Sequence, residues 1–411
     1  MLVCLAFLLI GNFARLIPSG GLGDNMLISE VLLYVLAGAY LLLSGPARRL
    51  SLPWVLPCAV VLLLSALTGV LQWGMQAVPL LYALRLLGTL TAGILLGTAL
   101  YLQYGQAFKR VTRLFVRLYL AVVALAFLLL LLFPDSRDLW AWLSRMGVVF
   151  QGDPHLNRLV SAYFDPNFFG VILLLPLTWS YVLLHSQPAF RWWAVLVLTL
   201  VAILLTGSRS ALAAAVLQLL FLLFLSALVA ARRSWIDTRH LLQASLSPIL
   251  LLALLPFYLP YLARTLIRLS TIGDDRSAAA RFDSYDFGMQ LIAAHPLFGV
   301  GYNYLSMFTE QYRRLPSLDS SLQATAANFG IPFTILLLGL TITAAFRWGA
   351  RLRGPLAFGF WAYWACLAVT ILFASQFNNV LYYVFWLLPA LGYTVYLGHC
   401  ARRQALGRAT P

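Results

Sequence analysis

Charged residues are scarce in this sequence: they make up 10% of its 411 residues, whereas hydrophobic residues make up 62%. The mean hydropathy is +0.87. Soluble domains carry about 25% charged residues, so a large soluble domain is excluded. Apolar stretches of about 20 residues, long enough to cross a bilayer as helices, recur from end to end. They predict a single all-α polytopic transmembrane domain over residues 1–411, with about 12 spans.

The first expected span is a short retained helix and not a signal peptide, because no basic region precedes its apolar run. The expected spans are residues 1–17, 27–44, 53–72, 79–102, 112–133, 166–185, 191–206, 209–230, 241–263, 321–346, 355–374 and 380–398.

Cysteine and lysine are also rare. The four cysteines lie in or next to apolar spans without metal-ligand spacing, so neither a disulfide nor a zinc site is expected. The single lysine, Lys109, ends no glycine-rich loop, which excludes a Walker-type ATP site. There is no Gly-x-Ser-x-Gly elbow and no His-Glu-x-x-His pair. We therefore expect no metal and no cofactor.

The net charge of +15 lies on one side of the predicted membrane. With the N-terminus inside, alternate loops and the C-terminus hold sixteen basic residues against one acid, Asp237. Basic residues in short loops mark the cytoplasmic face, where they contact anionic lipid, so both termini are predicted to be cytoplasmic and no nucleic acid is expected. A nucleotide-sugar enzyme usually holds a metal with carboxylates, which this face lacks. The basic residues are Arg48, Arg49, Lys109, Arg110, Arg113, Arg117, Arg191, Arg232, Arg233, Arg239, Arg347, Arg351, Arg353, Arg402, Arg403 and Arg408.

Two long loops fall on the opposite, outer face. In the loop 134–165, apolar residues at helical spacing predict a helix lying in the membrane interface. In the loop 264–320, a second apolar stripe predicts a helix across the membrane surface. Long structured loops often carry functional sites. The first stripe consists of Leu139, Trp142, Leu143, Met146 and Phe150, with Trp140 beside it, and the second of Phe282, Tyr285, Met289 and Ile292.

Arginines are the main candidates for binding on this outer face. Arg209 lies between two spans with almost no loop, where an ionisable group is costly and usually functional. Arg85 lies deeper and is either a substrate ligand or part of a structural ion pair. Arginine binds phosphate with two parallel hydrogen bonds, so these residues suggest a lipid-borne diphosphate. The other outer arginines include Arg158, Arg281, Arg313 and Arg314.

Few acidic or histidine residues accompany these arginines. Asp165 precedes Pro166 and Asn167, and it either caps that helix or contacts substrate. Asp319 precedes the tenth span, where capping by Asp319 or Ser320 competes with catalysis. His295, before a proline, is more typical of a structural turn, although it is kept as a candidate for substrate binding.

Four segments resemble the O-antigen ligase and polymerase superfamily of bacterial envelope biosynthesis. The likeness runs from about Arg158 to Ile331, and the order and spacing of the pieces make it specific. The segments are Arg158-Leu-Val-Ser-Ala-Tyr-Phe-Asp-Pro-Asn167, Thr206-Gly-Ser-Arg-Ser-Ala211, Arg281-Phe-Asp-Ser-Tyr-Asp286 with His295-Pro-Leu-Phe-Gly-Val-Gly301, and Leu322-Gln323 to Asn328-Phe-Gly-Ile331.

The resemblance implies a metal-independent, inverting glycosyltransferase of the GT-C type in the inner membrane. Such enzymes take a glycan from an undecaprenyl-diphosphate donor at the outer face. Ligases pass it to lipid A-core, and polymerases pass it to another lipid-linked repeat unit. By the resemblance, Arg209 and Arg281 would hold the diphosphate, with help from Arg158. A chain-length regulator is a candidate protein partner.

One departure favours a polymerase over a ligase. Ligases typically carry a His-Asn pair just before Leu-Gln, but here the stretch Leu318 to Ser321 contains no histidine. Asp319 is then the best available base for the acceptor hydroxyl. A ligase is the nearest alternative, and a lipid-linked glycan flippase or a scaffold protein are alternatives of a different class.

Overall fold

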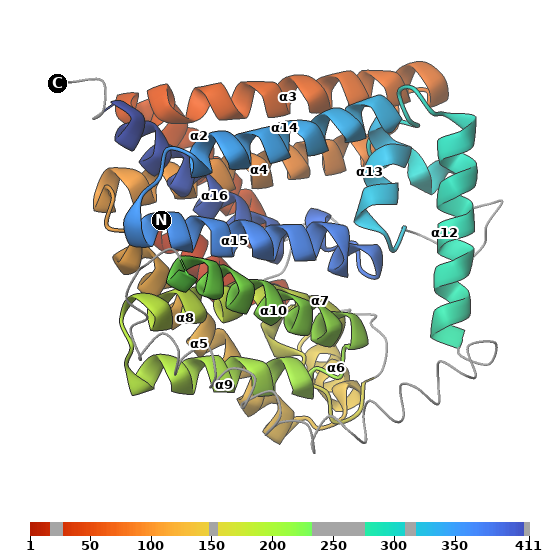
Figure 1. Cartoon of the computed structure of the whole chain (residues 1–411). Helices are drawn as coiled ribbons and strands as arrows, with labels where there is room; N and C mark the ends of the chain where they lie inside the picture. Colours follow the sequence, from red (N-terminus) through yellow and green to blue (C-terminus); the bar gives the residue numbers. More distant parts are fainter. Residues whose placement is uncertain (17–27, 148–154, 232–275, 309–317, 407–411) are drawn as a thin grey trace.

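A computed structural model describes residues 1–16, 28–147, 155–231, 276–308 and 318–406 (Figure 1). Within these ranges the chain is helical and contains no β-strand. The α-helices are α1 (Leu2–Ile10), α2 (Ile28–Leu43), α3 (Gly45–Trp73), α4 (Ala77–Tyr104), α5 (Phe108–Leu132), α6 (Ser136–Arg145), α7 (Pro166–Ile172), α8 (Leu174–Ser186), α9 (Phe190–Leu205), α10 (Arg209–Ala231), α12 (Arg276–Ala294), α13 (Ser321–Phe329), α14 (Ile331–Gly349), α15 (Gly354–Leu372) and α16 (Val384–Leu406). Short 3-10 helices are η1 (Gly11–Leu16), η2 (Ser161–Tyr163), η4 (Tyr304–Phe308), η5 (Ala374–Gln376) and η6 (Val380–Tyr382).

The predicted membrane class agrees with these helices. In the described ranges, 8 helices are long and apolar enough to cross a bilayer: α3, α4, α5, the joined pair α7–α8, α10, α14, α15 with η5, and α16. Three shorter apolar helices cover Leu2–Ala14, Ser29–Leu43 and Phe190–Leu205. Together they match every expected span except residues 241–263, which lie outside the described residues. The total of 12 spans therefore stays a prediction.

The expected span 321–346 is not one helix. The structure divides it into α13 and α14 at Gly330, whose φ is +89°. A Cβ added at Gly330 would lie 2.1 Å from the carbonyl oxygen of Leu297, so a side chain would clash there as well as strain the backbone. Pro332 then stands in the first turn of α14, where a proline suits a helix start. The prediction of a continuous helix was wrong because hydropathy does not reveal this break.

Burial distinguishes the centre of the bundle from its lipid-facing edge. In the most apolar stretches of α7–α8 and α16, 89% and 83% of the residues are buried, whereas the corresponding share in α14 is 6%. The exposed side chains of α14 include Ile335, Leu340 and Phe346. Large apolar side chains on an exposed helix face are expected where the surrounding solvent is lipid.

The helix α12 lies crosswise at one end of the bundle, next to α13 (Figure 1). The C-terminal turns of α3 reach the same end: Gln72 and Trp73 donate side-chain hydrogen bonds to the carbonyl oxygens of Gly299 and Val300, at 3.3 and 3.1 Å. Most of the described basic loop residues lie near the opposite ends of the helices, at the start of α3 and α5 and the end of α14 and α16. The described helices therefore separate a basic end from the end that α12 covers.

A helix is present in each of the two predicted outer loops, as α6 and α12, and its position at a membrane surface stays a prediction. In α6, Leu139 and Leu143 of the predicted stripe are buried. In α12, Phe282 and Met289 of the predicted apolar stripe are each 58% exposed, whereas Ser284, Phe287 and Leu291 are buried. The buried face of α12 contacts the segment around α13 through Ser284 and Gly288.

Candidate active site

The turn between α9 and α10 carries Arg209 as the first residue of α10. Thr206 Oγ1 accepts a hydrogen bond from Ser208 N at 3.3 Å, and Ser208 Oγ accepts one from Ala211 N at 3.4 Å. These bonds hold a short turn, which spans residues 206–208. The half-buried Arg209 follows it directly at the N-terminus of α10. The helix dipole favours anions at a helix N-terminus, so the backbone adds to the charge of Arg209.

Arg158 connects this turn to the start of α7. Its Nε donates to the carbonyl oxygen of Thr206 at 2.6 Å, and its Nη2 donates to Asn167 Oδ1 at 2.9 Å. Asp165 Oδ1 accepts hydrogen bonds from Asn167 N and Phe168 N, at 2.7 and 3.0 Å, and so caps α7. The three predicted residues Arg158, Asp165 and Asn167 therefore lie together, and their hydrogen bonds position the segment that precedes Arg209.

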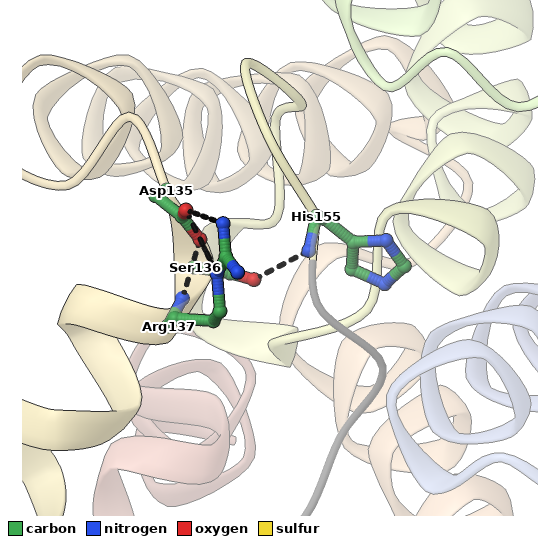
Figure 2. A network of polar contacts seen from close by, with 4 residues as sticks. All are labelled: Asp135, Ser136, Arg137 and His155. Carbon is green, nitrogen blue, oxygen red and sulfur yellow. Dashed lines mark hydrogen bonds and ion pairs between the residues drawn. The ribbon is translucent and has the colours of Figure 1, made fainter.

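His155 extends this group of residues to α6. Its ring nitrogen Nδ1 lies 3.2 Å from Arg158 Nη1. Figure 2 shows the other side of the connection: His155 N donates to Ser136 Oγ at 2.7 Å, beside the ion pair of Arg137 with Asp135. The ring of His155 points away from that ion pair (Figure 2). The hydrogen bond between Ser136 and His155 thus anchors the loop that leads to Arg158.

The second half of the site combines α12 with the segment before α13. Ser284 Oγ accepts a hydrogen bond from Asp319 N at 3.0 Å. Burial raises the pKa of the half-buried Asp319 carboxyl above its ordinary value, and the positive charge of Arg281 partly opposes this shift. Arg281 is therefore close enough to Asp319 to act on it electrostatically. A carboxyl with a raised pKa is better suited to accept a proton near neutral pH.

Ser320, and not Asp319, caps α13. Ser320 Oγ accepts a hydrogen bond from Gln323 N at 3.3 Å and donates one to Gln376 Oε1 at 2.8 Å. The competing capping role for Asp319 is thus filled by its neighbour, which leaves the Asp319 carboxylate available for chemistry.

The segment 376–378 joins the two halves of the site. Tyr285 Oη donates to the carbonyl oxygen of Gln376 at 2.5 Å, and Asn378 Nδ2 donates to Ser210 Oγ at 3.1 Å, next to Arg209. Sequence reasoning missed both Gln376 and Asn378. The available signal was the polar run Ser375 to Asn379, which interrupts two apolar spans.

The other residues predicted to bind substrate are Arg85, His295, Arg313 and Arg314. Arg85 Nη2 forms an ion pair with Glu30 Oε1 at 2.6 Å, and Glu30 is fully buried. His295 packs edge-on against Trp73, with ring centroids 5.7 Å apart, as a structural turn residue would. Arg313 and Arg314 lie outside the described residues. Among the residues that the structure describes, no group of three His, Cys, Asp or Glu side chains could hold a metal ion.

Comparison with known families covers the part of the chain that contains Arg209, Arg281 and Asp319. Residues 194–338 match the family model described as O-antigen ligase. No curated protein matches the chain. The match extends from α9 into α14, and it leaves Arg85 and the Arg158 group outside. Residues 194–338 are therefore similar to the O-antigen ligase family, which confirms the predicted resemblance of this chain to the O-antigen ligase and polymerase superfamily; the preference for a polymerase stays a prediction.

Proposed function

We propose that this protein is a glycosyltransferase that moves a glycan from undecaprenyl diphosphate to an acceptor at the outer face of the bacterial inner membrane. The observation that carries the proposal is that residues 376–378 contact both Ser320, next to Asp319, and Ser210, next to Arg209, while Gln376 also binds Tyr285 of α12. It supports a site that combines arginines, suited to a diphosphate, with a carboxylate suited to a hydroxyl proton.

The proposed reaction is an inverting displacement at the anomeric carbon. The acceptor hydroxyl loses its proton to Asp319 as its oxygen attacks the anomeric carbon. The bond from that carbon to the diphosphate oxygen breaks, and its electron pair leaves with the lipid diphosphate. Arg209 and Arg281 stabilise the negative charge that develops on this leaving group. Charge-assisted hydrogen bonds contribute about 1.5–3 kcal/mol each, so two or three suffice for substantial stabilisation without a metal.

A polymerase is favoured over a ligase because Asp319 stands where the ligase histidine would be. The acceptor is then a second lipid-linked repeat unit and not lipid A-core. The direct test is to incubate the purified protein with a lipid-diphosphate-linked repeat unit. A ladder of longer glycans is the expected product, and the absence of any transfer to either kind of acceptor would contradict the proposal.

The proposed orientation predicts the result of a topology assay. The charge asymmetry predicts that the end covered by α12 is outside the cell and the basic end inside. A reporter that is active only outside the cytoplasm should be active when fused after Thr271 and inactive when fused after Arg233. The same two fusions should give the opposite pattern with a reporter that is active only in the cytoplasm. Reversed activities would overturn both the orientation and the outward-facing site.

The polymerase proposal predicts a specific phenotype for cells that lack this protein. They should keep single repeat units on the final acceptor and lose long chains, because attachment of one unit needs no polymerisation. Glycan length on the acceptor and on the lipid carrier would be compared by gel electrophoresis. Accumulation of long lipid-linked chains that never reach the acceptor would instead identify a ligase.

A further inference from the structure

A cavity of about 170 Å³ lies beside the candidate site, between α4, the turn 302–305, α13 and residues 379–384. A cavity of about 150 Å³ can hold one benzene ring, so this space is suited to a single six-membered ring. Its polar lining includes Tyr82, Arg85, Asn303, Asn328, Asn379 and Tyr382. Amide and aromatic side chains that converge on one space can orient a small polar group.

The charges around the cavity favour an uncharged occupant. Arg85 is the cation of the lining, and its guanidinium is already paired with the buried carboxylate of Glu30 at 2.6 Å. The pair therefore contributes little net charge, and a diphosphate would find a better partner at Arg209 or Arg281. Arg85, predicted from the sequence as either a substrate ligand or part of an ion pair, thus forms the ion pair while it lines a cavity.

The hydrogen-bonding groups suit the hydroxyls of a sugar. Asn379 Oδ1 is buried and has no hydrogen-bond partner among the described residues. A buried acceptor without a hydrogen-bond partner is costly, and a ligand hydroxyl that donates a hydrogen bond would satisfy it. Asn328 Oδ1 accepts a hydrogen bond from Asn303 N at 3.1 Å, which orients the Asn328 amide. The tyrosines provide aromatic faces, against which the C–H face of a sugar ring can pack.

The walls of the cavity are held in place before any ligand binds. Tyr302 N donates to Ser65 Oγ at 2.9 Å, and Tyr382 Oη lies 2.8 Å from Thr325 Oγ1. The backbone of Gly301 packs so closely on α3 that an added Cβ would lie 2.5 Å from the Cα of Gly69. Since little ordering is needed on binding, even a few hydrogen bonds can contribute to affinity.

Two pairs of consecutive residues connect the cavity to the reacting groups. Leu318 lines the cavity, and its neighbour Asp319 faces the charge of Arg281. Asn379 lines the cavity, and its neighbour Asn378 donates a hydrogen bond to Ser210, next to Arg209. The wall of the cavity is therefore continuous along the chain with the segments that carry the proposed base and that contact the proposed diphosphate site.

We propose that this cavity binds one uncharged sugar ring of the glycan substrate. The inference rests on the proposed glycosyl transfer for the identity of the glycan. The ring belongs either to the acceptor, whose hydroxyl Asp319 would deprotonate, or to the donor sugar next to the diphosphate. Both sources offer the same chemistry, hydroxyl edges and an apolar ring face.

Binding by the purified full-length protein tests the proposal without relying on transfer. The probes are the repeat-unit oligosaccharide freed of lipid and diphosphate, and undecaprenyl diphosphate without a glycan. Asn379→Ala and Asn328→Ala should each weaken oligosaccharide binding about tenfold, the effect of losing one hydrogen bond, and leave undecaprenyl diphosphate binding unchanged. The control Gln103→Ala removes an exposed amide from the opposite end of α4 and should change neither. Melting temperatures identify any variant that fails to fold.

Unchanged oligosaccharide binding by both folded variants, or no binding by the wild type, would overturn the cavity proposal even if transfer proceeds. If the variants weaken oligosaccharide binding but the wild type transfers no glycan, the transferase proposal fails and the proposal of a sugar-binding cavity stands. With active protein, two-substrate kinetics separate the sources of the ring. A raised KM for the acceptor alone in Asn379→Ala assigns the cavity to the acceptor, and a raised KM for the donor alone assigns it to the donor.

Discussion

Arg209→Ala and Arg281→Ala are each expected to abolish detectable transfer, a loss of at least about 10²-fold, while the protein still inserts into the membrane and purifies normally. The reason is electrostatic: removal of a single group that stabilises developing negative charge typically costs about 10²–10³-fold in rate. Arg→Lys at either position should also be impaired, because an ammonium group cannot form the two parallel hydrogen bonds of a guanidinium. Transfer from a lipid-diphosphate-linked repeat unit to the acceptor is the measurement.

Arg137→Ala is the matched control for these two substitutions. It removes an arginine whose side chain is 68% exposed and which, among the described residues, pairs with its near neighbour Asp135, so transfer should be retained. EDTA should have little effect on the wild type, since the arginines are proposed to stabilise the leaving group themselves. Near-normal transfer by either alanine variant would remove that residue from the donor site. If the protein is a scaffold, neither substitution should reduce its function. Strict dependence on a divalent metal would contradict the proposed mechanism.

Asp319→Asn is expected to lower transfer by about 10²–10⁴-fold, the usual contribution of general acid–base catalysis. Asparagine keeps the shape of the side chain but cannot accept the acceptor proton. Thermal stability should hardly change, because Ser320 and not Asp319 caps α13. Ser320→Ala is the complementary variant: loss of a helix cap costs about 1 kcal/mol of stability. A silent Asp319→Asn variant would leave the acceptor without an identified base.

The pH dependence of transfer gives an independent measurement of Asp319. The residue acts as a base only when it is ionised, and burial raises its pKa. Transfer by the wild type should therefore decline, as the pH falls, at a higher pH than for an ordinary aspartate with a pKa of about 3.9. This acidic limb should be absent from the residual activity of Asp319→Asn. For stability the sign is opposite: a raised carboxyl pKa makes the folded state less favourable as the pH rises through it, so Asn should not destabilise the protein at neutral pH.

The membrane class and most of the helices were predictable from the sequence because they depend on local composition. Twenty apolar residues must form a helix in lipid wherever they occur, since no water is available to the backbone. The same local information located Arg209 between two spans and Arg281 in a helix of the large loop. It did not predict the break at Gly330, because that break depends on contact with Leu297.

The arrangement of the site was decided by the tertiary structure. The apolar spacing of α12 did not reveal that Ser284 and Gly288 make its contacts with the segment around α13. Gln376 and Asn378 went unnoticed because their importance lies in hydrogen bonds to Tyr285 and Ser210, residues far away in the chain.

The sequence by itself determined the membrane environment of this protein, its helical class and the chemical types available for a site: arginines for an anion and a carboxylate for a proton. These properties follow from side-chain chemistry and hydropathy, which each residue carries regardless of its neighbours. Only the tertiary structure decided that Ser320 caps α13, that Arg85 is paired with Glu30, and that Arg85 and Leu318 line one cavity. The physical reason is that capping, ion pairing and cavities depend on which distant segments are packed together, and helix packing sets that in three dimensions.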